Sequence, residues 1–173
     1  MKVSGTCTLG AGAAEVFDAI CDPGTLLAVI PGCEAIERTG PDEYAGRISL
    51  RLPGAAGSYR TLVRLVDAVR PERAGMEGSV EGPMGSIRGR AEFELAPAPS
   101  AGEAPLPPET VLDYRGDAVI QGPLARLDSR FAERLAESLI SQGLRALDHR
   151  LIEARTTVAS APGRPSTSAE EPE

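Results

Sequence analysis

Apolar and polar residues alternate with a period of two along most of the chain, and this alternation predicts strands. In residues 44–52 apolar or small residues alternate with Arg47, Ser49 and Arg51, as in a strand with one buried and one solvent-facing side. The same pattern predicts seven strands in all, at about residues 2–9, 35–38, 44–52, 59–66, 74–82, 87–95 and 110–121.

Three other segments carry a helical period. Residues 13–21 place Val16, Phe17 and Ile20 on one apolar face, and residues 25–30 form a second short helix. The longest helix is expected from Pro123, which suits a first helical position, to about Arg155. Its apolar residues recur at steps of three to five positions: Leu124, Leu127, Phe131, Leu135, Leu139, Leu144, Leu147 and Leu151.

The order of these elements predicts an α+β helix-grip fold. In this fold a curved seven-stranded antiparallel sheet wraps around a long C-terminal helix, with two short helices after the first strand. A twisted antiparallel sheet curls, and only the terminal helix is long enough to cover its concave face. We expect one ligand-binding domain over residues 1–155, with a Pro-rich hairpin loop at 96–109. Residues 156–173 lack apolar periodicity and are expected to be a disordered acidic tail.

Small residues on the inward side of the predicted strands favour an apolar cavity beneath the helix. They are Gly46, Gly78, Gly89, Ala91, Gly116 and Ala118. Glycine in a strand can equally mark a bulge or a bend. Larger inward side chains would line the cavity, and we expect ligand contacts from Tyr44, Ile48, Leu50, Tyr59, Val63, Leu65, Phe93, Tyr114, Ile120, Leu127, Phe131 and Leu135. Each buried tyrosine hydroxyl needs a hydrogen-bond partner, either a ligand carbonyl or a backbone carbonyl.

Composition excludes some classes of partner. The formal net charge is −7 without a basic patch, which disfavours nucleic acid and adsorption to anionic lipid. Cys7, Cys21 and Cys33 have no paired short spacing, so reduced thiols are expected. The chain has no signal-peptide pattern and no apolar run of transmembrane length. We therefore expect a cytoplasmic protein, at most transiently peripheral to the inner face of the cell membrane.

The sequence offers little that resembles catalytic machinery. The single histidine, His149, lies near the end of the long helix, where an exposed imidazole is favoured. Asp113 and Asp117 flank Arg115 on the predicted outward side of a strand. General acid–base catalysis in an apolar cavity needs a titratable group inside it, and the predicted inward positions supply only tyrosines. We therefore expect no enzyme activity, no metal and no cofactor.

Several motifs together resemble the CoxG family of carbon monoxide dehydrogenase subunits, within the START/Bet v 1-like superfamily. They are AAEVFDAICDP at 13–23, IPGC at 30–33 with Glu34, GPMG at 82–85 with Gly89, Ala91 and Leu95, LDY at 112–114 with Ala118, and residues 122–127 with Arg130. The resemblance covers residues 1 to about 152. It implies an accessory role beside molybdenum-containing hydroxylases, whose lipophilic acceptor would be a respiratory quinone.

The leading hypothesis is a non-catalytic carrier. It would bind a quinone or another lipid-like molecule and present it to the molybdenum hydroxylase, or help to recruit that enzyme to the membrane. The first alternative is an assembly factor without ligand, which would dock through exposed strand arginines: Arg47, Arg51, Arg60, Arg64, Arg88 and Arg90. A solvated sheet face explains these arginines equally well. The second alternative is a polyketide cyclase-like enzyme, since the superfamily includes such enzymes.

Overall fold

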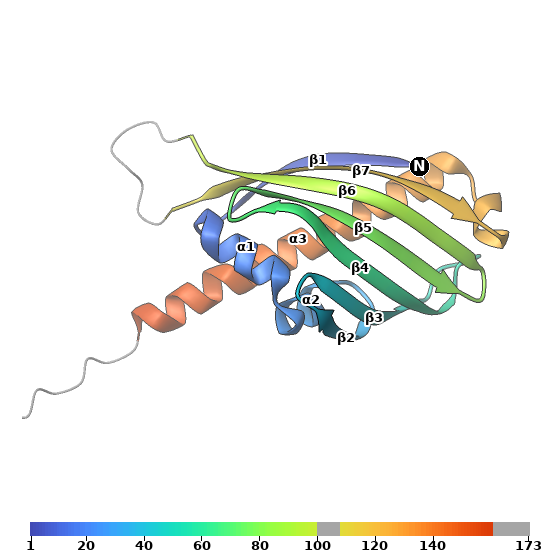
Figure 1. Ribbon diagram of the computed structural model, residues 1–173, viewed down its shortest axis with the longest axis horizontal. Coiled ribbons are helices and arrows are strands. Elements are labelled where there is room, and N and C mark those ends of the chain that lie inside the picture. Colours follow the sequence, from blue (N-terminus) through green and yellow to red (C-terminus); the bar gives the residue numbers. More distant parts are fainter. Residues whose placement is uncertain (100–107, 161–173) are drawn as a thin grey trace, which may run out of the picture.

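The computed structural model describes residues 1–99 and 108–160 (Figure 1). The elements follow in the order β1 (Lys2–Leu9), α1 (Ala13–Cys21), α2 (Pro23–Val29), β2 (Cys33–Gly40), β3 (Glu43–Leu50), β4 (Gly57–Val69), β5 (Arg73–Gly82), β6 (Gly85–Pro97), β7 (Thr110–Gln121), the 3-10 helix η1 (Pro123–Arg126) and α3 (Ser129–Ala159). Every predicted strand and both short helices are present, several with longer bounds than the sequence indicated.

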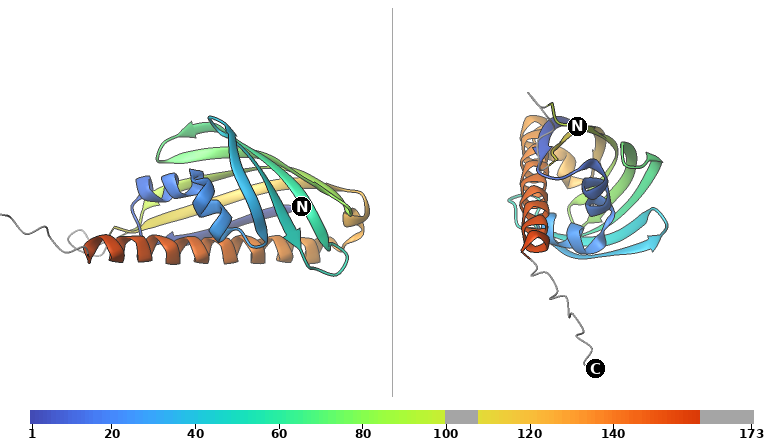
Figure 2. Two further views of the ribbon diagram at one scale, coloured as in Figure 1. Left: turned by 90° about the horizontal axis from the view of Figure 1, so that it is seen from below. Right: turned by 90° about the vertical axis from the view of Figure 1, so that its left-hand side faces the viewer.

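The seven strands form one antiparallel sheet in the order β1-β7-β6-β5-β4-β3-β2. Figure 2 shows the sheet curving around α3, with α1 and α2 beside the helix. Helix α3 contacts β1, at one edge of the sheet, and the short helix α2. This arrangement confirms the predicted helix-grip fold.

The start of the long helix differs from the prediction. The backbone of Leu127 is extended and separates η1 from α3. Asp128 then caps α3, because its carboxylate accepts a hydrogen bond from Phe131 N at 3.0 Å. The prediction missed this break because the apolar spacing continues across it. The helix also ends at Ala159 rather than near Arg155, whereas residues 161–173 lie outside the described part.

Buried side chains gather in two clusters at opposite ends of the sheet. The large cluster includes Phe17 of α1, Phe93 of β6 and Leu147 of α3. Its other buried members are Leu9, Ala11, Val16, Cys21, Val29, Tyr44, Leu65, Ala74, Leu95, Leu112 and Leu151. The small cluster contains Ala55, Tyr59 and Leu124 and closes the other end through the β3–β4 loop and η1. The middle of the concave face lies between the two clusters.

Candidate ligand-binding site

The strand register brings five small residues together in the middle of the concave face. Gly78 of β5 pairs with Gly89 of β6, and Gly89 pairs with Ala118 of β7. One row further along, Ala91 pairs with Gly116. These five residues, called the small-residue floor below, share the strand face of the buried side chain Phe93. No side chain on this floor extends beyond a methyl group.

The residues around the floor are only partly buried, although the fold points them inward. Val3 pairs with Gly116 and Val63 pairs with Gly78 of the floor, and both are of intermediate exposure. The apolar residues Ile48 on β3 and Leu135 and Leu139 on α3 are of intermediate exposure as well. None of them belongs to either core cluster. Core side chains normally interlock at crystal-like density. Partial exposure of inward apolar groups therefore indicates that the section between floor and helix is underfilled.

The hollows found on the described residues are open to solvent. One of about 640 Å³ reaches the floor at Ala91 and Gly116. Much of its lining is charged and includes Lys2, Asp67, Glu77, Arg90, Glu92 and Arg115. A smaller groove of about 160 Å³ runs between β1 and α3 beside Tyr114. Neither hollow corresponds to the predicted closed apolar cavity, which stays a prediction.

The twelve residues predicted to contact ligand are distributed over four environments. Tyr44, Leu65 and Phe93 belong to the large cluster, and Tyr59 belongs to the small one, against which Leu50, Ile120 and Leu127 pack. Tyr114 is partly buried and packs against the large cluster. Ile48, Val63 and Leu135 are partly buried and belong to neither cluster. Phe131 is 41% exposed. Among the partly buried residues outside both clusters, Val63 lies directly beside the small-residue floor, because it pairs with Gly78.

Two of the three tyrosine hydroxyls form hydrogen bonds with backbone carbonyl oxygens. Tyr44 donates to the carbonyl oxygen of Cys21 at 2.8 Å, and Tyr59 donates to that of Ala55 at 2.9 Å. The side chain of Tyr114 lies over Gly5 and has no hydrogen-bond partner among residues 1–99 and 108–160. Burial raises the pKa of all three phenols. Backbone bonding, one of the two alternatives left open by the sequence, thus holds for Tyr44 and Tyr59.

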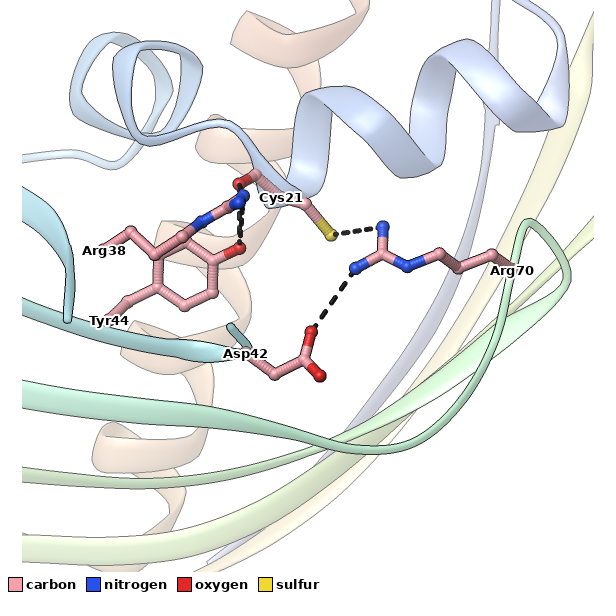
Figure 3. Close-up of polar contacts among 5 residues, drawn as sticks. All are labelled: Cys21, Arg38, Asp42, Tyr44 and Arg70. Carbon is pink, nitrogen blue, oxygen red and sulfur yellow. Dashed lines mark hydrogen bonds and ion pairs between the residues drawn. The ribbon is translucent and has the colours of Figure 1, made fainter. Parts of the chain in front are cut away.

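A polar cluster around Cys21 ties the end of α1 to the sheet (Figure 3). The Arg70 guanidinium lies 3.6 Å from the Cys21 thiol and 3.4 Å from the carboxylate of Asp42. Arg38 donates to the Cys21 carbonyl oxygen at 2.8 Å and to the Tyr44 hydroxyl at 3.2 Å. Cys21 itself is only 4% exposed. The cluster therefore positions α1 rather than offering a reactive thiol.

The outer face of the sheet carries paired charges. Four of the predicted docking arginines lie in cross-strand ion pairs, namely Arg47–Glu34 at 2.9 Å, Arg64–Glu77 at 3.0 Å, Arg90–Glu77 at 2.7 Å and Arg88–Glu81 at 3.3 Å. Hydrogen bonds from Arg64 and Arg90 lower the pKa of Glu77. Exposed pairs of this kind contribute little to stability. Their pairing favours a solvated face over a set of free arginines.

The remaining candidate groups lie on the surface. His149 is exposed, and its Nε2 lies 3.5 Å from Glu153. Asp113, Arg115 and Asp117 face outward as expected. Within the described ranges, no three His, Cys, Asp or Glu side chains are grouped to hold a metal ion.

Thr61 is an inward residue of β4 that was not among the residues predicted to line the site. Thr61 is 8% exposed, and its hydroxyl has no hydrogen-bond partner in the part of the chain that the structure describes. The alternation of β4 shows that Thr61 faces inward. The sequence could not distinguish it from Thr110, which has a partner.

Comparison with known proteins relates this chain to one family. The family model described as the CoxG subunit of carbon monoxide dehydrogenase matches residues 5–152. No curated protein matches the chain. No helix in the described ranges has a stretch long and apolar enough to cross a bilayer.

Several solved structures share the fold at low sequence identity. A conserved protein from Geobacillus kaustophilus has a TM-score of 0.81 at 22% identity, over 89% of this chain and 97% of its own. A START superfamily protein from Mycobacterium smegmatis has a TM-score of 0.67 at 12% identity, over 88% of this chain and 98% of its own. The di-domain ARO/CYC StfQ from the steffimycin biosynthetic pathway has a TM-score of 0.62 at 11% identity, over 90% of this chain and 52% of its own.

Proposed function

We propose that this chain, which belongs to the CoxG family of carbon monoxide dehydrogenase subunits, binds a lipophilic molecule between α3 and the small-residue floor. A quinone is the preferred ligand, because it is the apolar acceptor that a molybdenum-containing hydroxylase would need. The protein would present this ligand to the hydroxylase, or help to recruit that enzyme to the membrane. It would not catalyse a reaction itself.

The observation that carries this proposal is the small-residue floor. Five neighbouring inward positions on β5, β6 and β7 have at most a methyl side chain, and the apolar residues around them are incompletely buried. Apolar surface removed from water contributes about 25 cal/mol per Å². A flat apolar ring or an isoprenoid chain over the floor would bury both its own surface and that of Val63 and Leu135.

The chemistry of the inward strand positions supports binding without catalysis. No Asp, Glu, His or Lys side chain occupies an inward position on β1, β3, β5, β6 or β7. The same holds for β4 up to the bulge after Val66. General acid–base catalysis needs such a group within reach of the substrate. The cyclase alternative has support from the fold of StfQ alone, so it ranks below a carrier.

A variant that fills the floor tests the proposal. Ala118→Leu adds three carbon atoms above Gly89 and requires no unusual backbone conformation. Gly89→Leu is less suitable, because a Cβ at Gly89 would meet Asp117 O at 2.6 Å. The control is Val119→Leu, which changes the next residue on the outer face, where Val119 is 62% exposed.

The measurement is calorimetric titration with a short-chain benzoquinone, together with solvent extraction and mass spectrometry of the purified protein. We expect wild type and Val119→Leu to bind the quinone, and Ala118→Leu to stay folded and lose binding. If wild type is always empty and takes up no quinone, the carrier function is refuted. If Ala118→Leu loses quinone binding and still supports the hydroxylase in cells, a surface role as assembly factor is favoured instead.

A further inference from the structure

Three threonines in the described part of the chain are buried, and Thr61 differs from the other two in its hydrogen bonding. Thr110 Oγ1 donates to Ala11 O at 2.7 Å, and Thr25 Oγ1 donates to Asp22 Oδ2 at 2.8 Å. Thr61 is 8% exposed, yet no described residue forms a hydrogen bond with its hydroxyl. The Thr61 oxygen is not sealed off, since the buried side-chain atom left without a partner among the described residues is Arg155 Nη1. The Thr61 hydroxyl is therefore free to bond a molecule that reaches it.

Thr61 lies close to the small-residue floor in the sheet. Its register partners are Gly46 on β3 and Val80 on β5, and Val80 pairs in turn with Ile87 of β6. The next inward position of β4 is Val63, which pairs with Gly78 of the floor. Thr61 thus lies one inward row away from the floor, among residues that offer no polar side chain.

Gly46 leaves the hydroxyl uncovered on the β3 side. A Cβ at Gly46 would come within 3.1 Å of Thr61 Oγ1, so a larger residue there would pack directly on that oxygen. The nearby tyrosine hydroxyls are already bonded to the backbone, Tyr44 to Cys21 and Tyr59 to Ala55. The Thr61 hydroxyl is therefore a free polar group at the margin of an otherwise apolar surface.

Tyr114 is the other inward tyrosine, and it is the weaker candidate. Its hydroxyl also lacks a partner within residues 1–99 and 108–160, but the side chain is only partly buried. It lies over Gly5 and lines the groove between β1 and α3. The Tyr114 hydroxyl lies at an open groove, where water can satisfy it, whereas Thr61 lies between Gly46 and Val80, beside the apolar rows of the floor.

We propose that the Thr61 hydroxyl is the polar anchor for the bound molecule and hydrogen-bonds an oxygen at one end of it. The apolar remainder of the ligand lies over the small-residue floor, toward α3. This inference rests on the proposed carrier function and narrows its ligand class to lipophilic molecules with a carbonyl or hydroxyl oxygen. A pure hydrocarbon chain would leave the threonine unpaired.

The choice of threonine suits a carrier of both redox forms of a quinone. A hydroxyl group can donate one hydrogen bond and accept others. It can therefore donate to the carbonyl oxygen of a quinone and accept from the hydroxyl of the corresponding quinol. A lysine or carboxylate at this position would favour one form and would have to be desolvated on burial.

The test compares Thr61→Val with Thr110→Val, two substitutions of the same shape and chemistry at buried strand positions. Each protein is titrated with a short-chain benzoquinone and with an alkylbenzene of similar size that lacks oxygen. We expect Thr61→Val to bind the quinone about tenfold more weakly and the alkylbenzene as well as wild type does. Thr61→Ser keeps the hydroxyl and should retain most of the quinone affinity.

Thermal melting of the free proteins gives a second readout. Thr61→Val should melt close to the wild-type temperature, because it breaks no hydrogen bond among the described residues. Thr110→Val should melt lower, because it breaks the bond to Ala11, and should bind quinone as wild type does. Thr61→Ala provides the same affinity comparison if valine is not accommodated.

The outcomes separate this inference from the function on which it rests. Equal quinone affinity of wild type and Thr61→Val overturns the anchor and leaves the carrier function intact. A similar loss of alkylbenzene and quinone binding in Thr61→Val also overturns it, because the effect would then be on packing. Failure of wild-type protein to bind either probe refutes the carrier function itself.

Discussion

Two leucines on α3 provide a direct test of the underfilled middle section. Leu147 is 4% exposed within the large cluster, whereas Leu135 is partly buried and belongs to neither cluster. Leu→Ala at either position makes the same change in the interior of the same helix, so helix propensity cancels in the comparison. The difference between the two losses therefore reports on packing.

The magnitudes follow from the burial. Replacing a leucine in a close-packed core costs about 2–5 kcal/mol, part of which is the cavity left behind. Leu147→Ala should lie in that range, at about 3 kcal/mol. Leu135→Ala removes a side chain that solvent already reaches and leaves no new enclosed cavity, so about 1 kcal/mol is expected. For a domain of this size, about 1 kcal/mol shifts the melting temperature by roughly 2–4 °C.

The assay is urea unfolding followed by far-UV circular dichroism, with thermal melting as a check. Equal m-values for the two variants and wild type would show that the unfolded state is unchanged. Equal losses of about 3 kcal/mol at both positions would refute the reasoning, because the middle section would then be packed as tightly as the large cluster.

Two further substitutions test local features of the fold. Asp22 caps α2, and its hydrogen bonds from Thr25 lower its pKa. Asp22→Ala should cost about 1 kcal/mol near neutral pH. Because the pKa of Asp22 is lower in the folded state, its contribution to stability is present above the unfolded-state pKa and is lost as the pH falls below about 4. Denaturant titrations of wild type and Asp22→Ala across that pH range measure the loss. A difference in unfolding free energy that did not change with pH would contradict the prediction. Gly143→Ala should raise the melting temperature by roughly 2–4 °C, because alanine has the higher helix propensity. The new Cβ would lie 3.5 Å from Val29 O, which is an ordinary contact. A lower melting temperature would show that α2 packs too closely for a methyl group.

Local patterns in the sequence predicted most of the secondary structure. β1 and β7 match the predicted bounds, Lys2–Leu9 and Thr110–Gln121, and α1 matches Ala13–Cys21. Period two and period 3.6 are properties of neighbouring residues, so they can be read without tertiary information. The start of α3 was harder to predict from the sequence, because the Asp128 cap interrupts an apolar spacing that continues through Leu124 and Leu127.

The partners of individual polar groups could not be read from the sequence. Tyr44, Tyr59 and Tyr114 all looked like inward hydroxyls, and only the packing of α1 and of the β3–β4 loop supplied acceptors for the first two. The outer arginines similarly looked like a docking face until the register paired four of them with glutamates on neighbouring strands.

The long C-terminal helix and the curled sheet were therefore determined by the sequence itself, since amphipathic periodicity and strand twist act locally. The small-residue floor depended on the tertiary structure. Gly78, Gly89 and Ala118 lie far apart in the chain, and only the register of β5, β6 and β7 places them side by side. Register is a long-range property. It decides where the interior is left unfilled and which hydroxyl, that of Thr61, remains at its margin without a partner among the described residues.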